Sequence, residues 1–155
     1  MNLNSPLINH ILLADDDRDH GILFSRILKR IDPGKTLSCV FDGDELFRFL
    51  EQHQVDMIFL DLRMPCKDGH QCLIDLKNHE GFNSIPVIVY STSSSMTDIQ
   101  KSFIHRADFY MVKPFNSEHL TNALESILSI NWKVGSPMNK HYFMNNRFVP
   151  FTATG

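Results

Sequence analysis

The stretch "IFLDLRMP", residues 58–65, joins an apolar run to a single carboxylate, Asp61. The residues before Asp61 are apolar at successive positions, which is typical of a strand buried on both faces of a parallel sheet. Pro65 and Gly69 then mark a loop. Because burying an unpaired charge is unfavourable, a carboxylate at the end of a buried strand indicates a special site at that edge of the sheet.

Short apolar runs of this kind alternate with helical patterns along the whole chain. The predicted strands cover residues 10–14, 36–41, 56–60, 85–90 and 109–112. Apolar residues at helical spacing predict helices over residues 19–31, 43–53, 69–79, 96–106 and 116–132, the last with Asn116 as its N-cap. Strict alternation with right-handed crossovers predicts a doubly wound α/β fold with five parallel strands and five helices.

Length and composition are those of one soluble globular domain. The chain has 155 residues, 43% hydrophobic and 21% charged. No apolar stretch approaches the roughly 18–20 residues that a membrane-spanning helix needs, and the N-terminus has no signal-peptide pattern. We therefore expect a cytoplasmic location.

The net charge of −3 is unevenly distributed. All 18 acidic residues lie between Asp15 and Glu125, whereas Lys133, Lys140 and Arg147 belong to a tail without acidic residues. Residues 1–130 hold 12 basic and 18 acidic residues and carry a charge of −6, and the tail carries +3. An acidic body argues against nucleic acid as a main partner, because phosphate contacts need positive charge.

Neither the cysteines nor the histidines form a recognisable metal or disulfide pattern. Cys39, Cys66 and Cys72 are irregularly spaced, which fits a reducing compartment. The eight histidines are scattered, so we interpret them as surface or core residues.

Polar side chains follow four of the predicted strands. They are Asp15, Asp16 and Asp17 after the first strand, Asp61 after the third, Ser91 and Thr92 after the fourth, and Lys113 after the fifth. Because ligands in such folds bind at the carboxyl ends of the strands, these groups are expected to share one edge. Clustered carboxylates need a cation, and hard oxygen ligands suit Mg²⁺, with Asp16 and Asp61 as its first ligands.

Taken together, these groups indicate phosphoryl transfer to an aspartate. That reaction needs a carboxylate nucleophile, a metal, a fixed cation such as Lys113 and a hydroxyl donor such as Ser91. Each group alone has a simpler explanation: the acidic triplet can cap a helix, and Asp61 can be a turn residue. Their joint placement at one edge is the signal.

Four motifs make residues 8–130 resemble the receiver domain of two-component response regulators. The motifs are "ILLADDD", "IFLDLRMPCKDG", "PVIVYSTS" and "ADFYMVKPF", in family order. The resemblance implies a flavodoxin-like sheet with strand order 2-1-3-4-5. It also implies a signalling phosphoacceptor with self-catalysed phosphoryl transfer and dephosphorylation, rather than a conventional enzyme.

The resemblance assigns roles to individual residues. Asp61 matches the phosphoacceptor, and Asp15 and Asp16 match the acidic pair that holds Mg²⁺ together with the backbone carbonyl of Arg63. Lys113 matches the lysine that pairs with the phosphoryl group. The following proline, Pro114, is often preceded by a cis bond in this family.

Further positions match the switch and the residues that tune it. Ser91 and Tyr110 match the switch pair, in which the hydroxyl moves toward the phosphoryl group and the aromatic ring turns inward. The surface expected to change and to bind a downstream target consists of the helix at 96–106, the strand at 109–112 and the helix at 116–132. Three positions are expected to tune access or phosphoryl lifetime: Arg63, Thr92 and Ser93. Arg106 stands where the family has glycine, which puts the loop geometry before the fifth strand in question.

The tail, residues 131–155, is too short for a separate output domain, since even a small DNA-binding module needs on the order of 60 residues. We therefore expect a single-domain regulator that receives its phosphoryl group from a histidine kinase or a phosphotransfer protein and acts by binding another protein. The tail is expected to be extended, and its aromatic residues suggest docking on its own domain or on a partner. These are Trp132, Tyr142, Phe143, Phe148 and Phe151.

Three alternatives remain open at this point. A haloacid-dehalogenase-type phosphatase also uses an aspartate nucleophile, but it needs an acidic residue where this chain has Arg63. A receiver-like module that binds without phosphorylation would have no need to keep Asp16, Asp61, Ser91 and Lys113 together. A phosphorelay intermediate uses the same residues as a switch, so the sequence does not separate the two.

Overall fold

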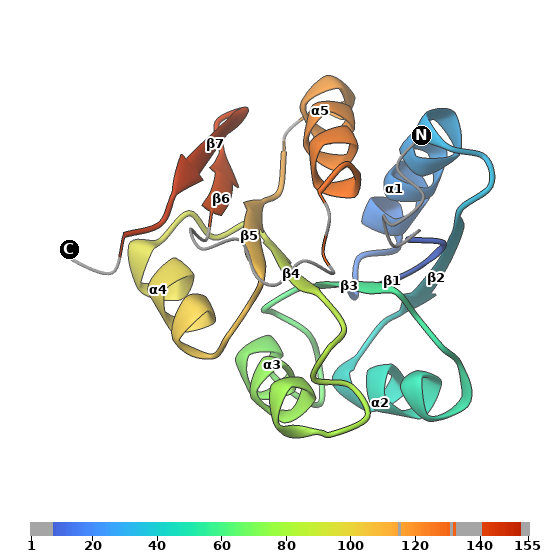
Figure 1. The fold of residues 1–155 in the computed structure, drawn as a ribbon, viewed down its shortest axis with the longest axis vertical. Helices are drawn as coiled ribbons and strands as arrows, with labels where there is room; N and C mark the ends of the chain where they lie inside the picture. Colours follow the sequence, from blue (N-terminus) through green and yellow to red (C-terminus); the bar gives the residue numbers. More distant parts are fainter. Residues whose placement is uncertain (1–7, 115, 131, 133–140, 153–155) are drawn as a thin grey trace.

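The computed structural model describes residues 8–114, 116–130, 132 and 141–152. Two basic residues of the predicted tail, Lys133 and Lys140, lie outside these ranges. The described chain forms one sheet with the strand order β2-β1-β3-β4-β5-β6-β7. Helices α1 and α5 cover one face of this sheet, and α2, α3 and α4 cover the other (Figure 1).

The five predicted strands and five predicted helices are confirmed, with ends shifted by at most four residues. The parallel strands are β1 (His10–Ala14), β2 (Thr36–Val40), β3 (Met57–Leu60), β4 (Val87–Ser91) and β5 (Phe109–Val112). The helices are α1 (Arg18–Ile31), α2 (Gly43–Gln52), α3 (Gly69–Asn78), α4 (Met96–Ile104) and α5 (Ser117–Leu128). Asn116 caps α5 as predicted, accepting a hydrogen bond from the backbone N–H of His119.

Alternation along β3 explains why its residues are all apolar. Met57 and Phe59 belong to the core under α1 and α5, whereas Ile58 and Leu60 belong to the core under α2, α3 and α4. All four side chains are fully buried. A strand with helices on both faces therefore has no position for a polar residue until it ends, and Asp61 is the first residue after that end.

The expected five-stranded sheet is corrected to seven strands, because part of the tail joins it. Strand β6 (His141–Met144) pairs parallel to β5, and β7 (Arg147–Pro150) returns antiparallel to β6. Strand β6 follows α5 and runs parallel to β5, but α5 covers the opposite face of the sheet from α2, α3 and α4, so this connection does not repeat those of the preceding strands. We call residues 141–152 the C-terminal hairpin; it is docked on the chain's own β5 edge.

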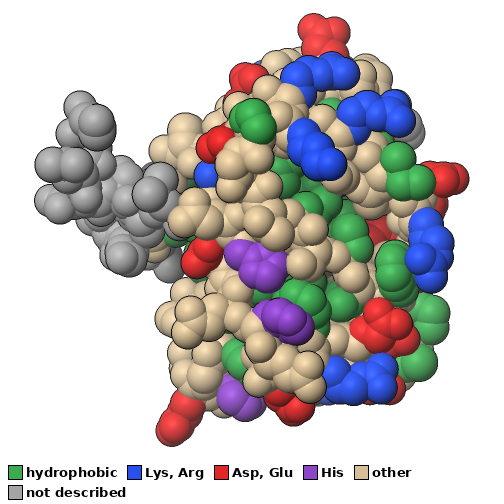
Figure 2. All heavy atoms as spheres, turned by 90° about the vertical axis from the view of Figure 1, so that its right-hand side faces the viewer, with side chains coloured by type: hydrophobic (Ala, Val, Ile, Leu, Met, Phe, Trp, Pro, Cys, Tyr) green, Lys and Arg blue, Asp and Glu red, His purple; other side chains and the backbone are tan. Residues whose placement is uncertain are grey.

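The acidic body does not present a uniformly negative surface. Figure 2 shows the side formed by α1, β2 and α2. Several lysine and arginine side chains gather there at the end where α1 lies. The last turn of α1 contributes Lys29 and Arg30. Among the described residues, no helix combines the length and apolar character needed to span a bilayer.

Arg106 has a left-handed backbone conformation, which is unfavourable for residues other than glycine. Its φ is +71°, a left-handed value that favours glycine. The guanidinium group offsets part of this cost by donating hydrogen bonds to the Lys77 carbonyl (2.9 Å) and to the Asn78 side chain (2.8 Å). The arginine therefore holds the loop before β5 against the end of α3.

Arg106→Gly is expected to be more stable than Arg106→Ala by about 1 kcal/mol, because both variants lose the guanidinium bonds but only alanine retains the left-handed strain. Urea unfolding of the two variants side by side measures this difference. An alanine variant as stable as the glycine variant would contradict the strain argument.

Candidate functional site

The site is built where β1 and β3 end side by side. Ala14 and Leu60 are paired in register, and the N–H of Asp61 donates to the Ala14 carbonyl at 2.9 Å. The next residues, Asp15 and Asp61, therefore leave the sheet as neighbours. Oxygens of Asp15, Asp16 and Asp61 all lie within 4.8 Å of one another, as the sequence predicted.

The three carboxylates differ in exposure. The side chains of Asp15 and Asp61 are only 1% and 9% exposed, and Asp16 is exposed. The third member of the acidic triplet, Asp17, caps α1 by accepting from the Asp19 N–H. The capping interpretation therefore holds for Asp17, and the assignment of Asp15 and Asp16 to a metal site stays a prediction.

Lys113 reaches the carboxylates from the end of β5. Its backbone N–H donates to the Ser91 carbonyl at 2.7 Å, which fixes the strand end against β4. Its ammonium lies 2.6 Å from Asp15 Oδ2 and 3.1 Å from Asp61 Oδ2. A single buried ammonium group therefore bridges two buried carboxylates.

His20 also belongs to the site, although the sequence analysis treated the histidines as core or surface residues. Its Nδ1 lies 2.9 Å from Lys113 Nζ and 3.0 Å from Asp15 Oδ2. Its Nε2 lies 3.4 Å from Asp17 Oδ2. The position of His20 in the first turn of the helix that follows the acidic triplet was a usable signal, because that turn faces the strand ends.

The two buried carboxyl groups have opposite pKa shifts. Burial raises the pKa of Asp61, with a further contribution from the charge of Asp15, and Lys113 offsets only part of this. Burial also acts to raise the pKa of Asp15, but bonds from Lys113, the Asp17 N–H and His20 hold that pKa below its usual value. One ammonium thus faces a cluster of three carboxylates, so the negative charge of the cluster is incompletely balanced.

This imbalance makes the cluster suitable for a divalent cation. Hard oxygen ligands with an exposed member, Asp16, match the preference of Mg²⁺ and Mn²⁺ for carboxylates and water. A bound cation would balance the excess negative charge that Lys113 leaves. The part played by the Arg63 carbonyl stays a prediction; the Arg63 N–H donates to Asp61 Oδ1 at 3.2 Å.

The predicted switch residues are connected to each other through Ser93. Ser91 is buried, and its Oγ accepts a hydrogen bond from the Ser93 N–H at 3.1 Å. Tyr110 is fully buried, and its hydroxyl donates to the Ser93 carbonyl at 2.8 Å. The Ser93 hydroxyl donates in turn to Asp98 of α4. The loop between β4 and α4 is thus hydrogen-bonded to Ser91 of the site, to Tyr110 of β5 and to Asp98 of α4.

The other predicted positions lie around this core of the site. Arg63 and Thr92 are exposed, so their side chains are free to line the approach to Asp61. The peptide bond before Pro114 is trans, so the cis form suggested by the resemblance is not the one found here. Gly69 lets α3 begin directly beside Asp61, since a Cβ at this position would lie 2.3 Å from the Asp61 carbonyl oxygen.

Comparison with known proteins identifies the class of this site. The family described as response regulator receiver domain matches residues 11–125. The "Probable methanogenesis regulatory protein FilR2" of Methanothrix harundinacea is 32% identical over 76% of this chain and 79% of that protein.

Two solved structures share the fold. The phosphorylated cyanobacterial phytochrome response regulator RcpA has a TM-score of 0.74 at 28% identity, over 82% of this chain and 96% of that one. The Mn²⁺-bound response regulator Rcp1 has a TM-score of 0.72 at 28% identity, over 83% of this chain and 99% of that one.

Asp61→Asn is expected to stabilise the metal-free chain at pH 7, by about 1 kcal/mol, as is common when a strained functional group is removed. The pKa of Asp61 is raised in the folded chain above its ordinary value of 3.8. As the pH rises through the folded pKa, the wild type therefore loses stability that the asparagine variant keeps. Urea unfolding measures this.

The gain should shrink toward pH 3.8 and below, where Asp61 is protonated in both states, and also when Mg²⁺ is added. Equal stability of the two proteins at pH 7 without metal would show that the Asp61 charge is already balanced.

Proposed function

The chain belongs to the response regulator receiver family of two-component signalling, and we propose that it accepts a phosphoryl group on Asp61. The donor is a sensor histidine kinase, a histidine phosphotransfer protein or a small phosphodonor. The observation that carries the proposal is the Lys113 ammonium 3.1 Å from Asp61 Oδ2, beside two further carboxylates. The signal passes on through contacts with other proteins.

The reaction transfers one phosphoryl group from the donor to Asp61 and later from Asp61 to water. An ionised Asp61 oxygen attacks phosphorus, and an O–P bond forms as the bond from phosphorus to the donor nitrogen or oxygen breaks. The leaving imidazole takes a proton from solvent, or acetate leaves as the anion when acetyl phosphate is the donor. In the second step water attacks the same phosphorus, the Asp61 O–P bond breaks, and inorganic phosphate leaves with the Asp61 carboxylate restored.

Charge neutralisation is the main task of the surrounding residues. When bound, Mg²⁺ supplies positive charge for the phosphoryl oxygens; we assign its ligands to Asp15, Asp16, Asp61 and the Arg63 carbonyl. The Lys113 ammonium redirects one of its hydrogen bonds from Asp61 Oδ2 to a phosphoryl oxygen. Asp15 keeps hold of the same ammonium and so limits how far it travels.

The switch depends on the Ser91 hydroxyl. This group accepts from the Ser93 N–H and has its own proton to donate, so a phosphoryl oxygen can draw it toward Asp61. The Tyr110 hydroxyl donates a hydrogen bond to the carbonyl of the same residue, Ser93. We assign Arg63, Thr92 and Ser93 to access and lifetime, since the first two are exposed at the site and Ser93 holds the loop.

The downstream partner is proposed to bind on the side formed by α4, β5 and α5. In this chain the C-terminal hairpin already lies at that edge, beside β5 (Figure 1). A partner on this side therefore contacts the hairpin together with α4, where Ile104 is 74% exposed. The exposed isoleucine is the kind of apolar group that such a contact would bury.

Incubating the chain with acetyl phosphate and Mg²⁺ is expected to add one phosphoryl group, seen by intact mass. Asp61→Asn should remove the adduct, because the amide cannot act as the nucleophile. Asp44→Asn, which alters an exposed carboxylate on α2, is the matched control and should keep it. Omitting Mg²⁺ should slow the reaction strongly.

The pattern of adducts decides between the alternatives. No adduct on the wild type, together with no binding of fluoroberyllate, would favour a module that acts without phosphorylation. An adduct that a histidine phosphotransfer protein rapidly removes would identify a phosphorelay intermediate using the same residues.

A further inference from the structure

The C-terminal hairpin lies outside the part of the chain that the receiver family matches, yet it is joined to the switch residue. Strand β6 pairs with β5 so that Tyr142 lies beside Tyr110 and Phe143 beside Met111. Tyr142 and Tyr110 belong to the same core, together with Phe103 of α4. The hairpin is therefore part of the environment of the Tyr110 ring.

The position of Tyr110 depends on this contact. The ring is fully buried and its hydroxyl points toward the loop after β4, where it bonds to Ser93. Strand β6 pairs with the edge of β5 at Tyr110, and Tyr142 of β6 packs in the same core as the Tyr110 ring. While β6 is paired, Tyr110 is held inward.

A second contact connects the hairpin to the same loop through α4. Phe151, just after β7, stacks on Phe103 with ring centroids 4.7 Å apart. The same helix carries Asp98, which accepts the hydrogen bond from the Ser93 hydroxyl. Both contacts of the hairpin thus converge on Ser93, whose N–H bonds to the Ser91 hydroxyl.

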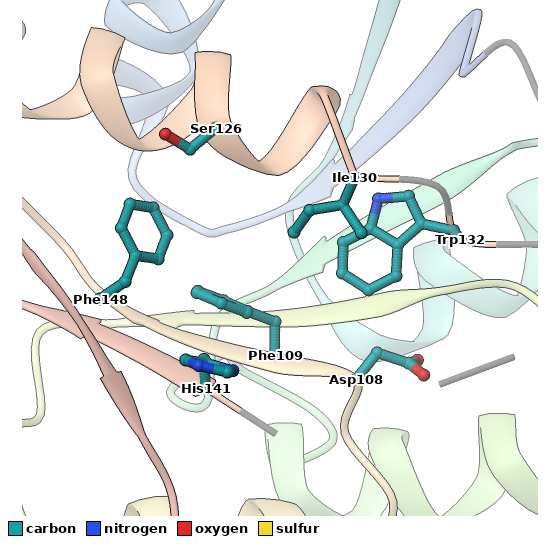
Figure 3. Close-up of a pocket in the computed structure, with 7 residues that line it drawn as sticks. All are labelled: Asp108, Phe109, Ser126, Ile130, Trp132, His141 and Phe148. Atoms are coloured by element: carbon teal, nitrogen blue, oxygen red, sulfur yellow. The ribbon is translucent and has the colours of Figure 1, made fainter. Parts of the chain in front are cut away.

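On the α5 side the hairpin packs less completely. A cavity of about 350 Å³ separates the hairpin from the end of α5. Figure 3 shows the rings of Phe109, Trp132 and Phe148 around it. Unfilled apolar surface forfeits dispersion energy, so this docking is weaker than that of a fully packed strand. A hairpin held firmly at Tyr110 and loosely at α5 is suited to reversible attachment.

We propose that docking of the C-terminal hairpin and occupancy of Asp61 by a phosphoryl group stabilise each other. This inference rests on the proposed function. The phosphoryl group draws the Ser91 hydroxyl away from Ser93 and favours the inward Tyr110, and the docked hairpin favours the same inward ring. By linkage, each event must strengthen the other by the same factor.

The test uses the full-length chain and fluoroberyllate, a mimic of the phosphoryl group, in the presence of Mg²⁺. Hydrogen exchange of residues 141–150 should slow when fluoroberyllate binds. Phe151→Ala, which loosens the hairpin without touching the site, should weaken fluoroberyllate binding by roughly three- to tenfold in calorimetric titration.

Phe82→Ala is the matched control, because Phe82 is also half-buried and stacked, on His79, but is remote from the hairpin. It should leave the affinity unchanged. If the wild type binds fluoroberyllate and Phe151→Ala binds it with the same affinity, the coupling is overturned and the proposed function stays intact. The same conclusion follows if hydrogen exchange in the hairpin of the wild type becomes faster on binding. Failure of the wild type to bind fluoroberyllate overturns both.

Discussion

Two buried carboxylates and one buried ammonium meet at the carboxyl edge of the sheet, and the remainder of the site is organised around their unequal charge. Lys113 contacts both Asp15 and Asp61 but balances only one of them. Hydrogen bonds hold the pKa of Asp15 below its usual value against the effect of burial, whereas burial raises the pKa of Asp61. The apo site is thus short of positive charge at the residue that we assign as the nucleophile, which is what a divalent cation would supply.

The fold and most of the site could be predicted because they follow from local patterns. Fully apolar runs of four to six residues identified parallel strands, and the rule that ligands bind at strand carboxyl ends placed Asp15, Asp61 and Lys113 together. His20 was missed although it lies in the first helical turn after the acidic triplet, because helical periodicity alone does not distinguish a residue that faces a site from one that faces solvent. Its role depends on the angle at which α1 leaves β1, which is a property of the packed structure.

The hairpin was harder to predict for a different reason. Its strands are four residues long and are separated from α5 by a segment without a helical or strand pattern, so only its aromatic content indicated docking. The partner was not deducible, because a short strand pairs with any compatible free edge. In the structure the free edge is that of β5, and adding β6 and β7 moves the exposed edge to a strand that ends in Pro150. A proline cannot donate a ladder hydrogen bond, which discourages further strand addition there.

Covering the β5 edge also changes what a phosphorylation signal can alter. Strand β6 pairs with β5 beside Tyr110, so we expect a change at Ser91 to be expressed through the loop at Ser93, through α4 or through the attachment of the hairpin itself. Of these, the hairpin borders a cavity beside α5, which leaves part of its apolar surface without contacts. We therefore expect part of the free energy released at Asp61 to change how tightly the hairpin is held.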